Sequence, residues 1–553
     1  VSGNSAMDGG GLASMYGSPV DVSDSTIAFN TASRPPLAGW LGGGGGVCVN
    51  SYSLRFANSI VANNTAGNNG HDISLFNVAG PTPPIAGDHN IVMSSTPAAP
   101  PDTISADPGL LPLADNGGPT RTHALAPGSV AIDVGLPFPG LLFDQRGAGF
   151  PRTLDAAADI GAFESGEPTP PVGECSEAAV RAAIAGAPDR GTVDLSLLSQ
   201  CTITLAGGAL TTGVDTLTII GPADRTLTLD GDLRDRVIQH NGGGVLTLGN
   251  LDITRGFVDD GKYAGGAVFS SGSIVLGSSR VTHSRIGGPA SNTLAFGGAG
   301  LYALHDVTLE GSVVSGNESR GRAGSICSMA GNVTIRRSTI SGNHSDLEGG
   351  GLFAPACFGV CTVGEFLTLI ENSTISGNSS GTHGGGVHTT YGNLDVRNST
   401  ITANSAQDAG AGGGGIFVRN VVNGVPLGPA VRVLSSIVAA NTSPHPDADI
   451  GSPMSLVLQG DHAIIMAMNG TAPPGTLVVS PGLLPLGDYG GPTPTHALAT
   501  DSPAIDNGSN PAQLASDQRG TGFPRVVGTE PDIGAFEFSQ PVVVDMIFED
   551  GFD

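Results

Sequence analysis

Positive charge is scarce in this 553-residue chain, and aromatic side chains make up only 5% of it. Lysine and arginine number 23 against 49 aspartates and glutamates, so the formal net charge is −26, and Lys262 is the only lysine. A surface this acidic repels the phosphate backbone of nucleic acids and is disfavoured at anionic membrane surfaces. We therefore expect no nucleic-acid partner, and a protein that stays soluble as a monomer.

Cysteine and long apolar runs are also lacking. Six cysteines are too few for disulfides to carry a fold of this length. No run approaches the ~18 consecutive apolar residues of a membrane-spanning helix, so we expect no transmembrane segment. A disordered chain is excluded because 39% of the residues are hydrophobic and valine, isoleucine and leucine recur at regular spacing, which is enough to build a core.

What the chain does contain is a repeated phrase. Serine, threonine and isoleucine are followed by a small residue and an asparagine, as in residues 338–343, 373–378 and 399–404. Runs of glycine lie between the copies, for example at 349–351 and 384–386. Internal repetition of this length is typical of solenoids and propellers.

Within each repeat the apolar residues alternate with polar ones over short runs, as in Val333-Thr334-Ile335. That period of two indicates strands. Glycine supplies the positive φ of sharp corners, and asparagine side chains stack as ladders between equivalent turns. The sequence therefore predicts an all-β fold, a right-handed parallel β-helix whose coils stack ~4.8 Å apart. A propeller is the alternative, but its blades need longer and more evenly spaced strands.

A longer duplication is also present. Residues 109–165 align without gaps with residues 482–538 at a constant offset of 373, and roughly 35 of the 57 positions are identical. Shared strings include Gly-Leu-Leu-Pro-Leu, Thr-His-Ala-Leu-Ala, Asp-Gln-Arg-Gly, Gly-Phe-Pro-Arg and Asp-Ile-Gly-Ala-Phe-Glu. We call the two copies the first and second closing modules. Each resembles the C-terminal domain of the choice-of-anchor Q family, which closes bacterial β-helix proteins. The resemblance implies a link to cell-surface attachment and no catalytic activity.

A capping segment precedes the second array. Apolar residues at i, i+3 and i+4 between Cys175 and Ile184 predict a short amphipathic helix, which would cover the open edge of the first coil. The segment is similar to the CSLREA motif that opens many such domains, although its residue order differs. The repeats themselves resemble those of bacterial surface β-helix proteins and of polymorphic outer-membrane proteins. Residues 265–268 are close to the Gly-Gly-Ala-Ile signature of the latter, whereas their Phe-type signature is mostly absent.

These observations predict two tandem arrays. The first residues match the interior of a repeat, so we expect the chain to begin inside a first β-helix. The expected parts are the end of a first β-helix (1–108), the first closing module (109–165), a Pro-rich linker (166–174), a capping segment (175–200), a second β-helix (201–481), the second closing module (482–539) and a tail (540–553). The tail resembles a short terminal tag of exported bacterial proteins, and a frayed terminus is the alternative.

The cysteines allow several interpretations. Cys175 and Cys201 bracket the capping segment, and a disulfide there would pin the helix to the first coil; two free thiols are the equal alternative. Cys357 and Cys361 could close a small ring, and a metal site is disfavoured because no histidine cluster accompanies them. Cys48 and Cys327 are expected to pack as small apolar residues.

Two sets of polar residues are candidates for chemistry. The acidic pairs Asp230/Asp232, Asp259/Asp260 and Asp447/Asp449 lie next to glycine or proline and are expected to be turn residues. Each closing module holds a histidine, several carboxylates and an arginine, which could form an acid–base site or tie loops together, the latter being favoured. These residues are His123, Asp133, Asp144, Arg146, Asp159 and Glu164, and in the second copy His496, Asp506, Asp517, Arg519, Asp532 and Glu537.

We expect an exported, noncatalytic bacterial protein at the cell surface or outside the cell, whose loops contact a polysaccharide or another cell-surface ligand. One alternative is a polysaccharide lyase or glycoside hydrolase acting on the flank of the second β-helix. Hydrolysis needs paired carboxylates, and elimination needs a calcium site with a basic side chain. No cofactor is expected, since calcium enters only with the elimination hypothesis and the Gly-Gly-x-Gly-x-Asp calcium repeat is absent. A structural spacer is the third hypothesis.

Overall fold

The computed structural model describes residues 1–539 except 18–19, 34–42, 52, 68–71, 77–81, 137–140, 148–149, 155–156, 167–170, 260–263, 289–296, 355–363, 408–409, 411, 423–424 and 427. The chain forms two compact units. The first contains Val1–Gly288 and Ala299–Ser312, and the second contains the chain from Val313 onward. Short strands dominate both, and the one helix in the described part is α1 (Glu177–Gly186).

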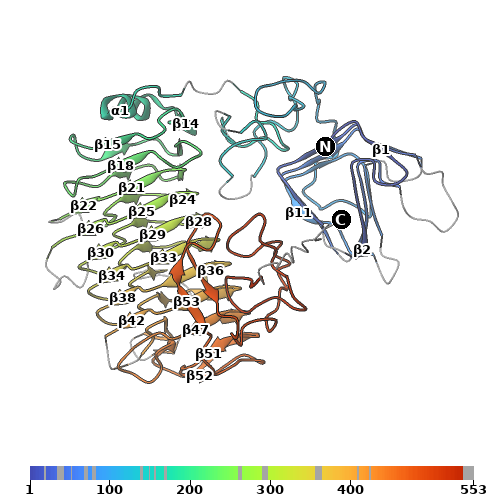
Figure 1. Ribbon diagram of the computed structural model, residues 1–553. Helices are drawn as coiled ribbons and strands as arrows, with labels where there is room; N and C mark the ends of the chain where they lie inside the picture. The colour runs from blue at the N-terminus through green and yellow to red at the C-terminus, as the bar shows by residue number, and fades with distance from the viewer. Residues whose placement is uncertain are drawn as a thin grey trace, which may run out of the picture. The chain divides into compact units, whose positions relative to one another are not determined.

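Strands β1–β13 form the first coil stack (Figure 1). Each coil contributes one strand to each of up to four sheets, and these strands pair in parallel with their neighbours. The sheets are β1 (Ser5–Ala6), β5 (Thr31–Ala32), β9 (Thr65–Ala66); β2 (Leu12–Gly17), β6 (Val47–Ser51), β10 (Ile73–Phe76), β13 (Ser95–Thr96); β3 (Val20–Ser23), β7 (Leu54–Ala57), β11 (Ala86–Asp88); and β4 (Thr26–Ala28), β8 (Ile60–Ala62), β12 (Ile91–Val92).

Strands β14–β52 form the second coil stack, built on the same principle with larger sheets. One sheet of ten strands has the order β14 (Gly191–Asp194), β17 (Leu217–Ile220), β20 (Val245–Gly249), β24 (Ser273–Gly277), β28 (Val307–Glu310), β32 (Val333–Arg336), β36 (Leu367–Glu371), β40 (Asn393–Arg397), β46 (Val431–Leu434), β50 (Gln459–Asp461). A second sheet of ten is β15 (Thr202–Thr204), β18 (Thr228–Asp230), β21 (Asp252–Thr254), β25 (Arg280–Thr282), β29 (Val313–Ser315), β33 (Thr339–Ser341), β37 (Thr374–Ser376), β41 (Thr400–Thr402), β47 (Ile437–Ala439), β51 (Ile464–Ile465). We call it the Ser-Thr-Ile sheet, after the repeat that supplies its strands.

Two further sheets complete the coils. The sheet of nine is β16 (Leu210–Thr212), β19 (Ile238–His240), β23 (Val268–Ser270), β27 (Leu301–Ala303), β31 (Ile326–Ser328), β35 (Leu352–Phe353), β39 (Val387–Thr390), β43 (Ile416–Arg419), β48 (Ile450–Gly451). The sheet of six is β22 (Phe257–Val258), β26 (Arg285–Ile286), β30 (Glu318–Ser319), β34 (His344–Ser345), β38 (Ser379–Ser380), β42 (Ser405–Ala406). Three pairs stand apart: β44 (Val421–Val422) with β45 (Val425–Pro426), β49 (Leu456–Val457) with β52 (Gly470–Thr471), and β53 (Leu483–Gly487) with β54 (Thr495–Leu498).

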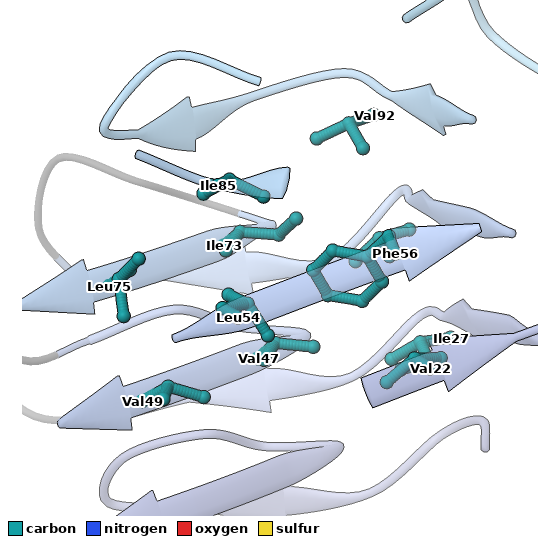
Figure 2. Packing of buried hydrophobic residues seen from close by; sticks show 11 residues of the cluster. Val22, Ile27, Val47, Val49, Leu54, Phe56, Ile73, Leu75, Ile85 and Val92 are labelled. Atoms are coloured by element: carbon teal, nitrogen blue, oxygen red, sulfur yellow. The ribbon is translucent and has the colours of Figure 1, made fainter. Parts of the chain in front are cut away.

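The predicted parallel β-helix is therefore confirmed, and the propeller is excluded because its blades are antiparallel. Successive coils pair in register, for example Leu248 with Leu276 and Ile375 with Ile401, so apolar side chains stack inside the coils. Figure 2 shows this packing in the first coil stack, where Val47, Leu54 and Ile73 belong to one buried cluster.

Polar ladders fix the corners. The side-chain amide of Asn343 donates to Asn378 Oδ1 at 2.8 Å, Asn378 donates to Asn404, and Asn404 to Asn441. Asp449 accepts from Asn441 at 2.9 Å and terminates the row. Gly384 begins a corner at φ +67°, where a Cβ would approach the Val387 carbonyl oxygen to 2.6 Å. Asparagine therefore forms the predicted ladder between coils, and glycine forms the predicted sharp corner.

The cap of the second coil stack is the expected helix. Ser176 caps the start of α1 by accepting a hydrogen bond from the Ala179 backbone at 3.2 Å. Val180 and Ile184 form its buried face. Cys175 and Cys201 form a disulfide across 26 residues, which joins the start of the helix to the residue just before β15.

Candidate functional site

The second closing module lies along the Ser-Thr-Ile sheet of its own unit (Figure 1). Its apolar side chains Leu498, Ile533 and Phe536 form one buried cluster with Ile437 and Ile464 of that sheet. The polar candidate residues of the module can therefore contact both the module itself and the coils beneath it.

Arg519 and Asp517 form the centre of the predicted set. Arg519 donates to Asp517 Oδ2 through Nε at 2.9 Å and through Nη2 at 2.6 Å, and Nη2 also donates to the Glu537 carbonyl oxygen. The guanidinium lies between the rings of Phe523 and Phe536, at 4.1 and 3.8 Å from their centroids. Both charged groups are buried, so this pair binds loops of the module to each other.

A second buried group surrounds Glu537. Its carboxylate accepts from the backbone N–H of Val527 at 2.9 Å and of Asp532 at 3.0 Å, and Arg525 lies 3.5 Å away. Burial raises the pKa of Glu537 to about 7, although the two N–H donors and Arg525 act in the opposite direction. Burial likewise raises the pKa of Asp532, whose oxygens accept from the Asp506 and Phe538 backbones.

His496 joins the module to the coils. Its Nδ1 lies 2.7 Å from the Leu484 carbonyl oxygen and its Nε2 lies 2.8 Å from the Ser376 hydroxyl on β37. Because a carbonyl only accepts, Nδ1 carries the proton and Nε2 accepts from Ser376. Burial lowers the pKa of His496, which keeps the ring neutral in this position.

Gln518 and Arg525 also belong to this arrangement, although neither is among the candidate residues predicted from the sequence. The Gln518 carbonyl oxygen accepts from the Thr374 hydroxyl at 2.6 Å, and its amide donates to Thr339 and Thr493, each at 3.0 Å. Gln518 is fully buried. The sequence signal for this residue is the glutamine that both Asp-Gln-Arg-Gly strings contain.

The first closing module repeats the same bonds in its own unit. Arg146 pairs with Asp144 at 2.7 Å, and Arg152 pairs with Glu164 at 2.9 Å. His123 Nε2 lies 2.7 Å from the Ser2 hydroxyl, as His496 does from Ser376. The module's Leu125 and Ile160 pack with Ile60 and Ile91 of the coils.

Asp144, Asp159 and Glu164 are buried like their counterparts in the second copy, whereas Asp133 is half-buried and its counterpart Asp506 is exposed. Asp159 accepts from the backbones of Asp133 and Ser165, and Asp133 accepts from Ala157. Burial raises the pKa of Asp159, and burial together with the Asp159 charge raises the pKa of Glu164 to about 9.

Chemically, this arrangement can fasten a module but offers no exposed acid–base pair. Hydrolysis of a glycoside needs two carboxyl groups that reach the substrate. Asp144, Asp517, Glu164 and Glu537 instead face arginines and backbone N–H groups and are at most 7% exposed. Across the described ranges, no group of three or more His, Cys, Asp or Glu side chains could hold a metal ion, and no helix is long and apolar enough to cross a bilayer.

Three comparisons with known proteins find nothing similar. No family model matches the chain, and neither the curated proteins nor the solved structures contain a match. The architecture is a parallel β-helix, and the resemblance of the closing modules and cap to named families remains a hypothesis.

The other candidate residues that the structure describes take part in separate structural contacts. Asp230 and Asp232 both bind Arg255, while Asp449 ends the asparagine ladder and Asp447 lies 3.3 Å from His445. Cys48 and Cys327 are both buried, as expected of small apolar side chains. Cys357, Cys361, Asp260 and the tail 540–553 lie outside the described residues.

One charged group on the flank of the second coil stack was not predicted. Arg336 binds Glu371 at 3.0 Å, and Arg397 binds Asp395 at 2.9 Å. Arg397 also lies 3.8 Å from Glu371, and Arg432 lies 3.9 Å from Asp395. The second oxygen of Asp395 is buried without a hydrogen-bond partner. We call these five residues the flank cluster.

Proposed function

We propose that this chain is an exported bacterial cell-surface protein that catalyses no reaction and presents its coil faces and loops for adhesion or glycan binding. The observation that carries the proposal is that the polar residues of the closing modules form structural contacts. Every histidine, arginine and carboxylate of the predicted acid–base set binds within its module or to the coils beneath it.

Export is supported by the disulfide between Cys175 and Cys201, because such bonds persist in oxidising compartments outside the cytosol. The resemblance of the closing modules to choice-of-anchor Q domains, and of the cap to the CSLREA motif, supports attachment at a bacterial surface. The acidic balance would keep such a protein soluble there.

Glycan binding is supported by the outer face of the Ser-Thr-Ile sheet in the first unit. Thr202 pairs with Thr228 in register, and Thr204, Asp230 and Thr254 form the neighbouring row. Asp230 is buried and bound to Arg255, so the groups that this rigid face offers are evenly spaced hydroxyls, which suit weak contacts repeated along a polymer. A net charge of −26 favours neutral glycans over polyuronates, which it repels.

The purified chain should be incubated with a panel of neutral and acidic polysaccharides, with and without calcium. We expect binding of a neutral glycan without release of reducing ends or unsaturated products. Thr202→Glu with Thr228→Glu should weaken binding about tenfold by charge and bulk, whereas the exposed-loop control Thr529→Glu should not. Release of products would contradict a noncatalytic protein, and absence of any binding would favour a structural spacer.

The flank cluster favours a second candidate, a polysaccharide lyase or hydrolase. It brings Glu371 and Asp395 together with three arginines, and one Asp395 oxygen has no hydrogen-bond partner. If the panel shows turnover, Asp395→Asn should abolish it while leaving the fold intact. Turnover that survives this change would place the reaction elsewhere.

A further inference from the structure

One corner of the first coil stack has side chains that the repeat does not predict. In the repeat a small residue comes before the ladder asparagine and adopts a positive φ, as at Gly316, Gly342, Gly377, Ala403 and Ala440. At this position the first coil stack has Phe29 at φ +57° and Asn63 at φ +60°. Left-handed backbone is unfavourable for a bulky side chain, and residues strained in this way cluster at functional sites. Phe29 is therefore a candidate for a role other than packing.

The second unit provides an internal comparison for this corner. Thr26 accepts a hydrogen bond from the first closing module as Thr400 does from the second. Phe29 and Ala403, each three residues later, therefore occupy the same corner of their coils. Because Ala403 adopts φ +56°, the backbone of the corner forms without a large side chain.

Support of His123 does not explain the phenylalanine. The rings of Phe29 and His123 are in contact, with 5.0 Å between their centroids, yet Phe29 is 42% exposed. In the second module His496 forms the same bonds as His123, to a leucine carbonyl oxygen and to a serine hydroxyl. The histidine thus keeps its position in a copy whose corner has alanine.

A cleft lies beside Phe29, with a volume of about 680 Å³. This volume is within the roughly 300–1,000 Å³ of sites for small ligands. Phe29, Thr65, Met93 and Asp107 are exposed members of the lining, and Asn63 is half-buried. In the described part the lining includes two aspartates and no arginine or lysine. The cleft therefore combines an apolar ring with polar groups that are neutral or negative.

The polar groups of the cleft are also specific to the first unit. The Asn63 side-chain amide lies 3.4 Å from Asp107 Oδ1, which accepts from the Gly109 backbone at 2.9 Å. Both contacts use Oδ1, so Oδ2 of this exposed carboxylate can accept from a ligand hydroxyl. The corresponding residues of the second unit are Ala440 and, at the offset of 373, Ser480. The scaffold therefore does not require an amide and a carboxylate here.

We propose that this cleft binds a sugar ring of a neutral glycan. The apolar face of the ring stacks on Phe29 beside Met93, and its hydroxyls bond the Asn63 amide and the Asp107 carboxylate. A sugar ring has both an apolar face and a rim of hydroxyls, which fits one aromatic ring with a few convergent polar groups. The aspartates of the lining disfavour an anionic sugar. The site rests on the proposed glycan-binding role and is separate from the threonine row at 202 and 228.

The second unit supplies the substitutions that test the site. Phe29→Ala, Asn63→Ala and Asp107→Ser each introduce the residue that the second unit has at that position, so the variants should keep the fold. Met93→Ala removes an apolar part of the lining. Met466→Ala, at its exposed counterpart in the second unit, is the matched control.

Each variant is made in the full chain and again with Thr202→Glu and Thr228→Glu, which block the threonine row. Titration calorimetry uses the neutral probes cellohexaose, maltohexaose, xylohexaose and mannohexaose, and an oligogalacturonate as the acidic probe. Hydrogen exchange of residues 60–66 locates the binding, with residues 437–442 of the second unit as the internal reference.

At least one neutral probe should bind with the threonine row blocked and should slow exchange at 60–66 but not at 437–442. Phe29→Ala should weaken this binding about tenfold through loss of stacking, and Asp107→Ser to a similar extent. Met466→Ala should leave it unchanged. The transition temperature of the first unit should stay the same or rise in Phe29→Ala, because alanine relieves the strain.

Three results would overturn the site. Binding that is lost when the threonine row is blocked and is insensitive to Phe29→Ala would leave the proposed function standing without this cleft. Absence of binding by every probe would remove both. A lower transition temperature in Phe29→Ala with unchanged affinity would show that the ring is structural.

Discussion

At the scale of single residues, Gln518 holds the second closing module by contacting groups from two coils and from the module itself. Its amide reaches Thr339, Thr374 and Thr493 at 2.6–3.0 Å in a fully buried position. Gln145 makes only the contacts within its module. A residue that bridges two surfaces contributes more to their association than one that bonds a single surface.

We therefore predict unequal effects of the same substitution. Gln518→Ala removes its buried hydrogen bonds to Thr339, Thr374 and Thr493 and leaves a cavity between module and coils, so it should lower the local stability of the second module by about 2 kcal/mol. Gln145→Ala should cost less than about 0.5 kcal/mol, as expected for an exposed side chain. Hydrogen exchange of β54 and of its counterpart at 122–125 measures both. Equal effects would mean that the contacts to the coils contribute nothing.

The buried glutamates predict a dependence of stability on pH. The folded pKa of Glu537 is about 7 against an ordinary value of 4.5, so the folded protein holds a proton that the unfolded chain releases. The stability from this group is complete below about pH 4.5 and is lost as pH rises through about 7. Glu164, with a folded pKa of about 9, acts in the same direction up to higher pH.

Glu537→Gln removes this titration but keeps the shape of the side chain. Calorimetry between pH 4.5 and 8 should show a smaller decrease of the second unit's transition temperature in the variant than in the unmodified protein. Glu530→Gln, at an exposed position, is the matched control. An unchanged pH profile in Glu537→Gln would show that Glu537 is ionised throughout.

At the scale of elements, the disulfide between Cys175 and Cys201 ties the capping helix to the coil that it covers. Replacing both cysteines by serine should cost about 3 kcal/mol of local stability for a ring of this size. The loss should appear as faster hydrogen exchange in α1 and β15, with β47 unchanged. If α1 and β15 exchange at the same rate in the variant and in the unmodified protein, the packing of α1 alone holds the cap on the coil.

The sequence predicted these elements well because their signals are local. Alternation at Val333-Thr334-Ile335, the glycine corners and the helical spacing after Cys175 each act within a few residues. The docking of the closing modules could not be predicted in that way. Ser376 and His496 meet across 120 residues, and Thr339 and Gln518 across 179, with no periodic pattern to indicate the partner.

The same reason explains what was missed in the candidate site. The duplicated strings identified His496, Asp517 and Arg519. However, a carboxylate beside an arginine gives the same sequence pattern in a catalytic site and in a structural ion pair. Burial separates the two, and burial depends on the coils beneath. The flank cluster was missed because Arg336, Glu371 and Arg397 become neighbours only when β32, β36 and β40 pair in register.

At the scale of the whole molecule, each unit combines stacked parallel coils with a module lying along their flank. In the first unit, strands of the Ser-Thr-Ile sheet carry the face proposed for glycans, whereas in the second unit that sheet is partly covered by the module. The candidate catalytic residues are used to hold it there. A binding or structural role for the open faces follows more directly than a reaction in the modules.

The most direct test of this account is a cross-link between coil and module. The hydroxyls of Thr374 and Thr495 lie 2.9 Å apart, so the double change Thr374→Cys and Thr495→Cys places two thiols within reach of a disulfide. Peptide mapping by mass spectrometry under mild oxidation should find this bond in the folded protein and not in the control pair Thr374→Cys and Thr529→Cys. Two free thiols at 374 and 495 in the folded protein would contradict the docking of the module on the coils.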